Sequence, residues 1–244
     1  MIYSIISDIH GNLAALDAFF EFYRKQGLNS GKIICAGDIV GYGPEPSQCL
    51  KLIRSITDII INGNHERMLL NMESRREASY LAVEAIEWVE RNMRPEEIDY
   101  ISRLPEHLIL DPSIYLIHGS PESPDEYIFT RESALRGIRV LKKLEVKRAI
   151  VGHTHVPGVF DQNGLKHYTP GKEFRLEPEQ HYIINPGSIG QPRDGDPRGS
   201  FCVMDTETLA VSFYRFEYDI DRTAEQITKA GLPIQLAHRL FNGI

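Results

Sequence analysis

Five short polar motifs, each placed directly after an apolar run, constrain this chain more than any other feature of its sequence. The apolar runs have the length and composition of buried β-strands. Because the carboxyl ends of neighbouring strands in a parallel α/β sheet open onto one crevice, motifs at these ends are expected to meet although they are far apart in the sequence. The motifs are Asp8-Ile9-His10, Gly37-Asp38, Gly63-Asn64-His65-Glu66, His118-Gly119 and Gly152-His153-Thr154-His155.

The first 65 residues alternate strand and helix, which indicates a largely parallel, doubly wound sheet. Strands are predicted at residues 2–7, 32–36 and 58–61, and helices at residues 12–25 and from Pro46 onward. Residues from about 66 to 105 break this rhythm. We predict a helical insertion there, which serves as a cover for the core, as a lid or as a subunit interface.

The second half of the chain is richer in predicted strands. Its elements are strands at residues 114–117, 148–151, 182–184, 201–204 and 210–218, a helix near 135–144, an Asn163-Gly164 hairpin, and closing helices at 219–230 and 234–241. The hairpin rests on the strong preference of Asn-Gly for tight two-residue turns. No repeat or long linker divides the sequence, so residues 1–244 are predicted to form a single domain.

The overall charge gives no reason to expect a nucleic-acid groove or a membrane surface. The net charge is −7, so an anionic substrate would have to be drawn by a local positive charge, which bound metal could supply. The three cysteines form no CxxC pair, and this favours a reduced, cytoplasmic compartment. No signal peptide or transmembrane run is apparent, and the sequence leaves a homo-oligomer open.

The motifs offer three oxygen donors and four imidazoles but no thiolate, a donor set that suits Mn²⁺, Fe²⁺ or Zn²⁺. Seven donors are too many for one tetrahedral ion. We therefore predict two divalent transition-metal ions that share a bridging carboxylate. Strand alternation would point Asp8 and His10 to the same side if the strand continued that far, and His153 and His155 have the same spacing.

His65 stands apart from this donor set because it directly follows Asn64 and cannot easily reach the same metal as its neighbour. It is better placed to protonate a leaving oxygen or to stabilise charge on a transferred phosphoryl group. General acid catalysis of this kind contributes about 10²–10⁴-fold to a rate. His65 is therefore the predicted catalytic residue.

Taken in order, these motifs resemble the D-x-H, GD, GNH(E), H and GHxH blocks of the calcineurin-like metallophosphoesterase superfamily. The likeness is greatest to its stand-alone prokaryotic phosphodiesterases and diadenosine tetraphosphatase-like proteins, through the phrases Ser7-Asp8-Ile9-His10-Gly11-Asn12 and Asn185-Pro186-Gly187-Ser188. The resemblance implies an α/β fold, a four-layer α/β/β/α sandwich of two mixed sheets flanked by helices. It also implies site roles by position: Asp8, His10 and His155 on the first metal, Asn64, His118 and His153 on the second, Asp38 as the bridge and His65 as the catalytic histidine.

One departure from the family pattern bears on the substrate. The protein Ser/Thr phosphatase branch has GD-x-x-D-R-G, and its second aspartate orients the catalytic histidine. Gly41 occupies that place here. The orienting partner of His65 is therefore unassigned, and classical phosphoprotein phosphatase activity is disfavoured.

Three further residues are candidates for substrate contact, each with a structural alternative. Arg193 could grip a phosphate with its guanidinium fork or be a solvated loop residue. Tyr42 could stack on a base or pack, and Asn12 could touch phosphate or cap a helix.

The predicted reaction is hydrolysis of a phosphodiester or phosphoanhydride, in a nucleotide or dinucleoside polyphosphate, by a hydroxide that two metal ions activate. The small phosphorylated substrate is the expected partner. The alternatives are a non-catalytic, metal-binding scaffold for protein interactions on the same fold, and a phosphomonoesterase or protein phosphatase.

Overall fold

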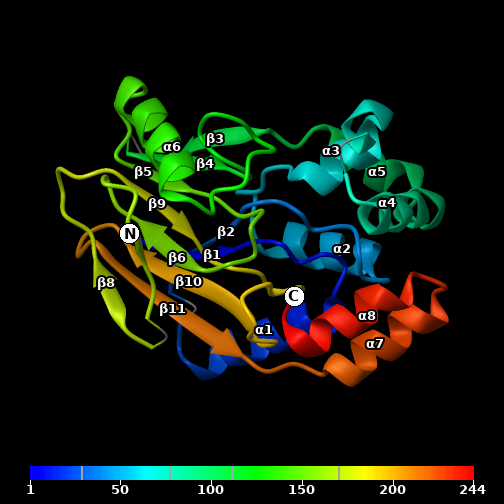
Figure 1. The fold of residues 1–244 in the computed structure, drawn as a ribbon. Helices are drawn as coiled ribbons and strands as arrows, with labels where there is room; N and C mark the ends of the chain where they lie inside the picture. The colour runs from blue at the N-terminus through cyan, green and yellow to red at the C-terminus, as the bar shows by residue number, and fades with distance from the viewer. Residues whose placement is uncertain (29, 77, 111–112, 170) are drawn as a thin grey trace.

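Two mixed β-sheets lie face to face at the centre of the computed structural model, which describes residues 1–28, 30–76, 78–110, 113–169 and 171–244 (Figure 1). One sheet has the strand order β2-β1-β10-β11-β8, and the other has the order β3-β4-β5-β9-β6-β7. The first sheet consists of β1 (Ile2–Ile6), β2 (Lys32–Cys35), β8 (Glu173–Arg175), β10 (Gly199–Asp205) and β11 (Ala210–Phe216). The second consists of β3 (His107–Leu110), β4 (Ile114–Ile117), β5 (Arg148–Ile150), β6 (Gly158–Phe160), β7 (Lys166–His167) and β9 (Tyr182–Asn185).

Helices cover the outer faces of both sheets and extend beyond one end of them (Figure 1). The helical elements are α1 (Leu13–Lys25), α2 (Pro46–Ile56), α3 (Asn64–Leu70), the 3₁₀ turn η1 (Met72–Arg75), α4 (Tyr80–Asn92), α5 (Pro95–Ser102), α6 (Arg131–Lys143), α7 (Ile220–Lys229) and α8 (Ile234–Asn242). Helix α6 lies on the six-stranded sheet, and α1 and α2 lie on the five-stranded sheet. The predicted four-layer α/β/β/α sandwich is therefore confirmed.

The parallel arrangement expected from the first 65 residues holds for β1 with β2 and for the bridge between Cys35 and Ile60, but not for the rest of the sheet to which they belong. Strand β1 pairs in parallel with β2 on one side, but its other neighbour is the late strand β10, which runs antiparallel to it. The predicted strand at residues 58–61 is also absent as a strand, because the structure has only an isolated bridge between Cys35 and Ile60 there. Hydrophobic patterning alone could not reveal that the chain returns from residue 199 onward to complete the first sheet.

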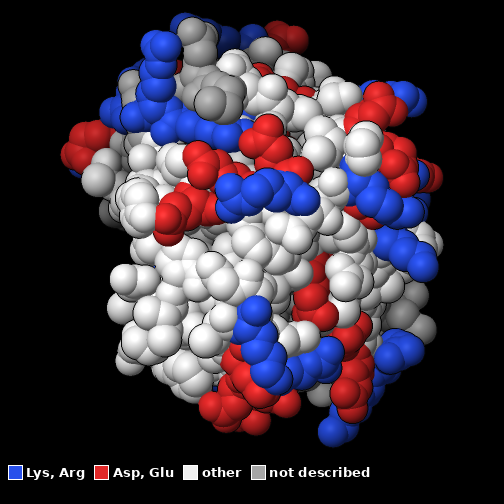
Figure 2. Space-filling model, turned by 90° about the vertical axis from the view of Figure 1, so that its right-hand side faces the viewer, with Lys and Arg blue, Asp and Glu red and all other residues white. Residues whose placement is uncertain are grey.

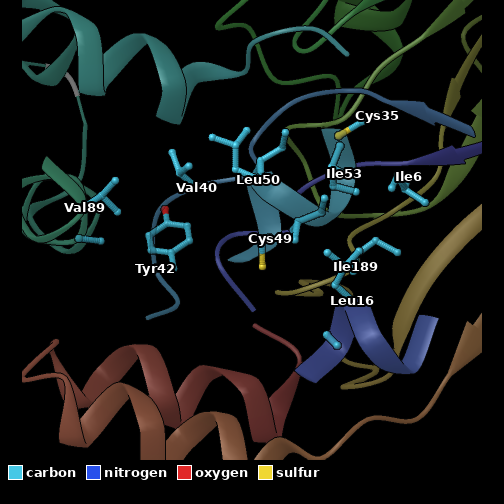
Figure 3. Close-up of a cluster of buried hydrophobic side chains, with 14 of the residues drawn as sticks. Ile6, Leu16, Cys35, Val40, Tyr42, Cys49, Leu50, Ile53, Val89 and Ile189 are labelled. Carbon is cyan, nitrogen blue, oxygen red and sulfur yellow. The ribbon is translucent and has the colours of Figure 1, made fainter. Parts of the chain in front are cut away.

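The core has separate parts that hold the layers together. Fully buried apolar side chains such as Ile34, Leu116 and Ile184 fill the space between the two sheets. A second cluster packs α1 and α2 against the five-stranded sheet, as the close-up of Ile6, Leu16 and Ile53 shows (Figure 3). Burial on this scale is the main stabilising contribution to a fold.

The predicted helical insertion is present as α3, η1, α4 and α5, and it packs against the C-terminal helices. Ile86 and Val89 of α4 belong to the same buried cluster as Ile227 and Leu236 of the last two helices. The indole Nε1 of Trp88 donates a hydrogen bond of 2.9 Å to the carbonyl oxygen of Ala230. The insertion therefore covers part of the core.

The face that carries α3–α5, α7 and α8 has acidic and basic side chains interspersed (Figure 2). A nucleic-acid track needs a continuous basic stripe, and the described residues of this face do not form one. Within the described residues, no helix has the length and apolar character that a bilayer crossing requires.

Candidate metal centre and active site

The polar motifs converge where their strands end. Asp8 follows β1, Asp38 follows β2, His118 follows β4 and His153 follows β5, and all four are buried. One ligand atom from each of Asp8, His10, Asp38 and His155 lies within 4.8 Å of the others, and so do ligand atoms of Asp38, His118 and His153. Asp38 belongs to both groups, so the structure brings the predicted donors into two adjoining sets around one shared carboxylate.

The backbone reaches this arrangement by left-handed turns rather than by strand alternation. Strand β1 ends at Ile6, and both Asp8 and His10 have positive φ, of 55° and 52°. Asp38, His153 and His155 have φ of 53°, 66° and 59°. The condition for strand alternation, a strand that continues to His10, is therefore not met. Positive φ costs a non-glycine residue free energy, and such residues concentrate at functional sites.

Backbone carbonyls orient three of the imidazoles. Nδ1 of His10 lies 3.2 Å from the carbonyl oxygen of Val40, and Nδ1 of His118 lies 2.7 Å from that of Ala36. Nδ1 of His155 bonds to the carbonyl oxygen of Gln191. A carbonyl oxygen can only accept, so each Nδ1 carries the proton and donates. In the neutral ring, Nε2 then presents a lone pair to the site, as in metal-ligating histidines.

Two of these lone pairs face each other at short range, because Nε2 of His10 is 3.1 Å from Nε2 of His155. Nε2 of His118 lies 3.2 Å from Oδ1 of Asn64. Burial, followed by the neighbouring His65, lowers the pKa of His10, and burial with Arg193 lowers that of His155. Both rings are thus neutral at pH 7. Facing acceptors repel unless a cation lies between them, so this donor set fits metal ions.

The carboxylates and His118 form the charged part of the site. Burial lowers the pKa of His118, but the nearby carboxylates of Asp38 and Asp8 outweigh it and raise that pKa to about 9. Burial raises the pKa of Asp38, yet His118 and His65 outweigh it and hold the pKa well below its usual value. Without metal, the site therefore holds a proton on His118 that a cation would displace.

His153 is oriented differently. Its Nε2 lies 3.0 Å from the carbonyl oxygen of Asp125, so Nε2 donates and Nδ1 is the nitrogen left for the cluster. The ring of Tyr127 stacks on His153 with centroids 3.7 Å apart and an angle of 14°. Burial lowers the pKa of His153 to about 3, so this ring is also neutral. Asp125 and Tyr127 precede α6 in a loop to which we assigned no functional residue from the sequence.

His65 lies beside the two donor sets. Its side chain is buried, and its Nδ1 has no hydrogen-bond partner among the described residues. Its ring meets the rings of His10 and Tyr42 edge-on, at centroid distances of 4.6 and 4.4 Å. Burial lowers the pKa of His65 to about 4. Aromatic contacts, in place of a carboxylate, therefore hold this neutral ring.

Glu66 is a structural residue of the site to which we assigned no role from the sequence. Its carboxylate is fully buried and accepts four backbone amides, those of Asp38, Ile39, Val40 and Gly63, at 2.7–3.1 Å. Burial and Asp38 raise its pKa to about 7, against the effect of the amides. It ties the loop after β2 to the start of α3. A glutamate three residues into a helix often accepts the amide of the capping residue, and that pattern was the available signal.

The three candidate substrate contacts differ in their burial and in their hydrogen bonds. Asn12 is the N-cap of α1: its Oδ1 accepts the amide of Ala15, and its Nδ2 donates to the carbonyl oxygen of Gly190. Since it is buried and bonded internally, we do not retain it as a substrate contact. Tyr42 is buried against His65, and the half-buried Arg193 donates to the Tyr42 hydroxyl at 3.3 Å.

A cavity of about 420 Å³ opens beside the second donor set. It is lined by Asn64, Met68, Ser74, Arg76, Ala78, Asp125, Tyr127 and His153, so the insertion forms part of its wall. Tyr127 and the exposed Phe129 stack with centroids 5.5 Å apart. A larger open hollow, of about 940 Å³ among α1, α2 and α7, contains none of the clustered residues.

Two mixed sheets flanked by helices, with aspartate, asparagine and histidine gathered at the strand ends, define a phosphoesterase of the metal-dependent class. The chain belongs to the calcineurin-like phosphoesterase superfamily, whose domain model matches residues 1–209. The family resemblance, the fold and the assignment as a phosphoric ester hydrolase are thereby confirmed.

Similar proteins occur in both archaea and bacteria, as the names of their source organisms show. An uncharacterized protein of Methanocaldococcus jannaschii is 35% identical over 243 residues, which are 98% of this chain and 97% of that protein. The crystal structure of a metallophosphoesterase from Sphaerobacter thermophilus is 34% identical, with a TM-score of 0.86 over 100% of both chains. A hypothetical protein from Pyrococcus horikoshii OT3 shares the fold at 20% identity, with a TM-score of 0.80 over 100% of this chain and 98% of that one.

Proposed function

We propose that this protein hydrolyses a phosphodiester or phosphoanhydride bond of a nucleotide with the help of two divalent metal ions. The first ion would lie among Asp8, His10 and His155, and the second among Asn64, His118 and His153. Asp38 would contact both. The observation that carries this proposal is the sharing of Asp38 between two buried donor sets, in the first of which the Nε2 lone pairs of His10 and His155 face each other. Ions held in this way supply Lewis-acid stabilisation of a phosphoryl group and activate water.

The metals are proposed to be Mn²⁺, Fe²⁺ or Zn²⁺, because the donors are imidazole nitrogens and carboxylate or amide oxygens. None of the three cysteines belongs to either donor set, and all three are buried free thiols. Free thiols are typical of a reducing compartment, so we propose a cytoplasmic location.

His65 is proposed to donate a hydrogen bond to a phosphoryl oxygen. A neutral imidazole has one N–H to donate, and the low pKa of His65 argues against a stored proton for the leaving group. Stabilising charge with a pre-placed donor is often the largest single contribution to catalysis.

The stacked pair of Tyr127 and Phe129 supports a nucleotide as the substrate. Tyr127 lines the cavity beside Asn64 and His153, and the ring of Phe129 is exposed next to it. Aromatic side chains of this kind stack on nucleobases, at about 1–3 kcal/mol for each base.

The test is metal-dependent hydrolysis by the purified chain. The protein is stripped with EDTA, reloaded with Mn²⁺, Zn²⁺ or Fe²⁺, and assayed with bis(4-nitrophenyl) phosphate, 4-nitrophenyl phosphate and nucleotide substrates. We expect turnover only with metal, and His65→Ala is expected to lower it by about 10²–10³-fold, the usual loss for one charge-stabilising donor, while metal content is retained. The matched control is His238→Ala, since His238 is exposed and outside the site. A folded, metal-loaded protein that turns over none of these substrates would favour the scaffold alternative.

A further inference from the structure

Two arginine side chains from separate parts of the chain meet at Tyr42. The guanidinium carbon of Arg193, in the loop after β9, lies 5.7 Å from the centroid of the Tyr42 ring. That of Arg239, on α8, lies 5.9 Å from the same centroid. Both side chains are half-buried. Two cationic groups are thus held near one aromatic ring by elements that are unrelated in sequence.

Neither arginine is paired with an aspartate or glutamate among the described residues. Arg193 donates to Oε1 of Gln191 and to the hydroxyl of Tyr42, and Arg239 donates to the main-chain oxygen of Ile244, the last residue of the chain. No aspartate or glutamate of the described chain pairs with either of them, whereas other arginines do form such pairs. Examples are Arg67 with Asp125, Arg198 with Asp196 and Arg215 with Asp194.

Like charges brought together in a partly buried place raise the free energy of the site unless an anion joins them. The repulsion is visible in Arg239, whose pKa is lowered by burial first and by Arg193 second. Arginine forks match phosphate geometry bidentately, which makes phosphate the favoured anion.

The position of the pair relates it to the proposed reaction. The ring of Tyr42 contacts both the arginines and the site, with its centroid 4.4 Å from that of His65 and 4.6 Å from that of His10. The backbone amide of Arg193 also donates to the carbonyl oxygen of His155, at 3.4 Å. Tyr42 is itself held with φ of 55° at the end of a buried apolar cluster (Figure 3). An anion on the arginines would therefore lie close to the donor sets but outside them.

We propose that Arg193 and Arg239 bind a second phosphate of the substrate, next to the one that is attacked. The inference rests on the proposed function and narrows it: the substrate contains at least two linked phosphates, as in a nucleoside or dinucleoside polyphosphate, and the bond that is hydrolysed is a phosphoanhydride. An isolated phosphodiester would occupy the donor sets and leave both guanidinium groups without a phosphate.

The experiment compares substrates that have one phosphate and several. The kcat/KM for a dinucleoside tetraphosphate is divided by that for bis(4-nitrophenyl) phosphate, in the metal-loaded wild type and in Arg239→Gln, Arg193→Gln and Arg239→Lys. Arg222→Gln is the matched control, because it removes the same charge from an exposed position on the neighbouring helix α7. We expect the ratio to fall about tenfold or more in Arg239→Gln and Arg193→Gln, the usual loss for a hydrogen bond to a charged group. Arg239→Lys should fall less, because the charge remains but the fork is lost.

A second measurement keeps the inference separate from the proposed function. Binding of inorganic pyrophosphate to the EDTA-treated and the metal-loaded protein is measured by calorimetry, with thermal melting to verify that each variant is folded. Weaker pyrophosphate binding in Arg239→Gln than in Arg222→Gln supports the second phosphate site even if no substrate is hydrolysed. An unchanged substrate ratio, or pyrophosphate binding that is equal in these two variants, overturns it.

Discussion

Nδ1 of His65 lies so close to Gly41 that a Cβ atom on Gly41 would be 2.0 Å from it. Gly41 also has φ of +92°, a conformation that side chains other than glycine rarely adopt. The structure thereby explains the departure from the protein Ser/Thr phosphatase pattern, in which an aspartate occupies this position. There is no room for a carboxylate here, and the rings of Tyr42 and His10 confine His65 instead.

Gly41→Ala is therefore expected to displace His65 and to lower kcat by about 10²–10³-fold, as if the histidine had been removed. Metal content should be retained, because the three atoms nearest to a Cβ on Gly41 all belong to His65 and not to a proposed ligand. Gly27→Ala is the matched control: Gly27 has φ of +66°, but an added Cβ would meet nothing within 4 Å. Equal activity of the two variants would contradict the proposed role of His65.

Asp38→Asn should weaken both metal sites together, because Asp38 belongs to both donor groups. Asp8→Asn is the comparison, since Asp8 belongs to the first group alone. Metal analysis and titration with Mn²⁺ should find both equivalents reduced in Asp38→Asn and one reduced in Asp8→Asn. Loss of a single equivalent in Asp38→Asn would reject the bridging role.

Glu66→Gln should destabilise the loop that presents Asp38. The amide NH₂ of glutamine cannot accept, so two of the four backbone amides that Glu66 binds lose their acceptor. We expect a loss of about 1–3 kcal/mol in unfolding free energy for each buried amide left without a partner, together with weaker metal binding. Glu97→Gln is a suitable control, because Glu97 caps α5 away from the site. It should lower stability without changing metal affinity.

Metal binding should release about one proton in weakly alkaline solution. The pKa of His118 is raised to about 9 in the metal-free site, so below that pH a cation must displace a proton. Raising the pH from 7.5 to 8.5 weakens the competition by the proton on His118, and the apparent affinity for Mn²⁺ should rise by up to about tenfold. Calorimetry in buffers of different ionisation enthalpy measures the released proton directly. Affinity that is flat, or falls, over this range would argue against His118 as a ligand.

The sequence predicted the strand ends well because β1, β2, β4 and β5 are short apolar runs with polar motifs directly behind them. The closing helices and the Asn163-Gly164 hairpin between β6 and β7 were equally clear. Partners distant in sequence were not predictable in this way. The pairing of β1 with β10 depends on a chain return that leaves no local pattern. The edge strand β3 was not predicted because two of its four residues are exposed, so it lacks the buried apolar run of the other strands.

In the site too, residues within local sequence motifs were predictable, and residues brought in from distant segments were not. Residues in motifs, such as Asp38 and His65, were identified from their neighbours in sequence. Tyr127 and Arg239 were missed because each is alone in its segment, and only folding brings them to His153 and Tyr42. For Asn12 the sequence left a phosphate contact and a helix cap open, and the structure shows the cap, with its hydrogen-bonding groups used within the fold.

The two sheets each contribute half of the site: Asp8 and Asp38 follow strands of one sheet, and His118 and His153 follow strands of the other. A shift of one sheet relative to the other would change the distances between the donor atoms, so bound cations would hold the two sheets in a fixed relative position at this edge. Catalytic activity would then depend on how well the two sheets are aligned. A conservative substitution in the core between the two sheets, such as Ile34→Val or Leu116→Val, should lower kcat/KM although the protein remains folded.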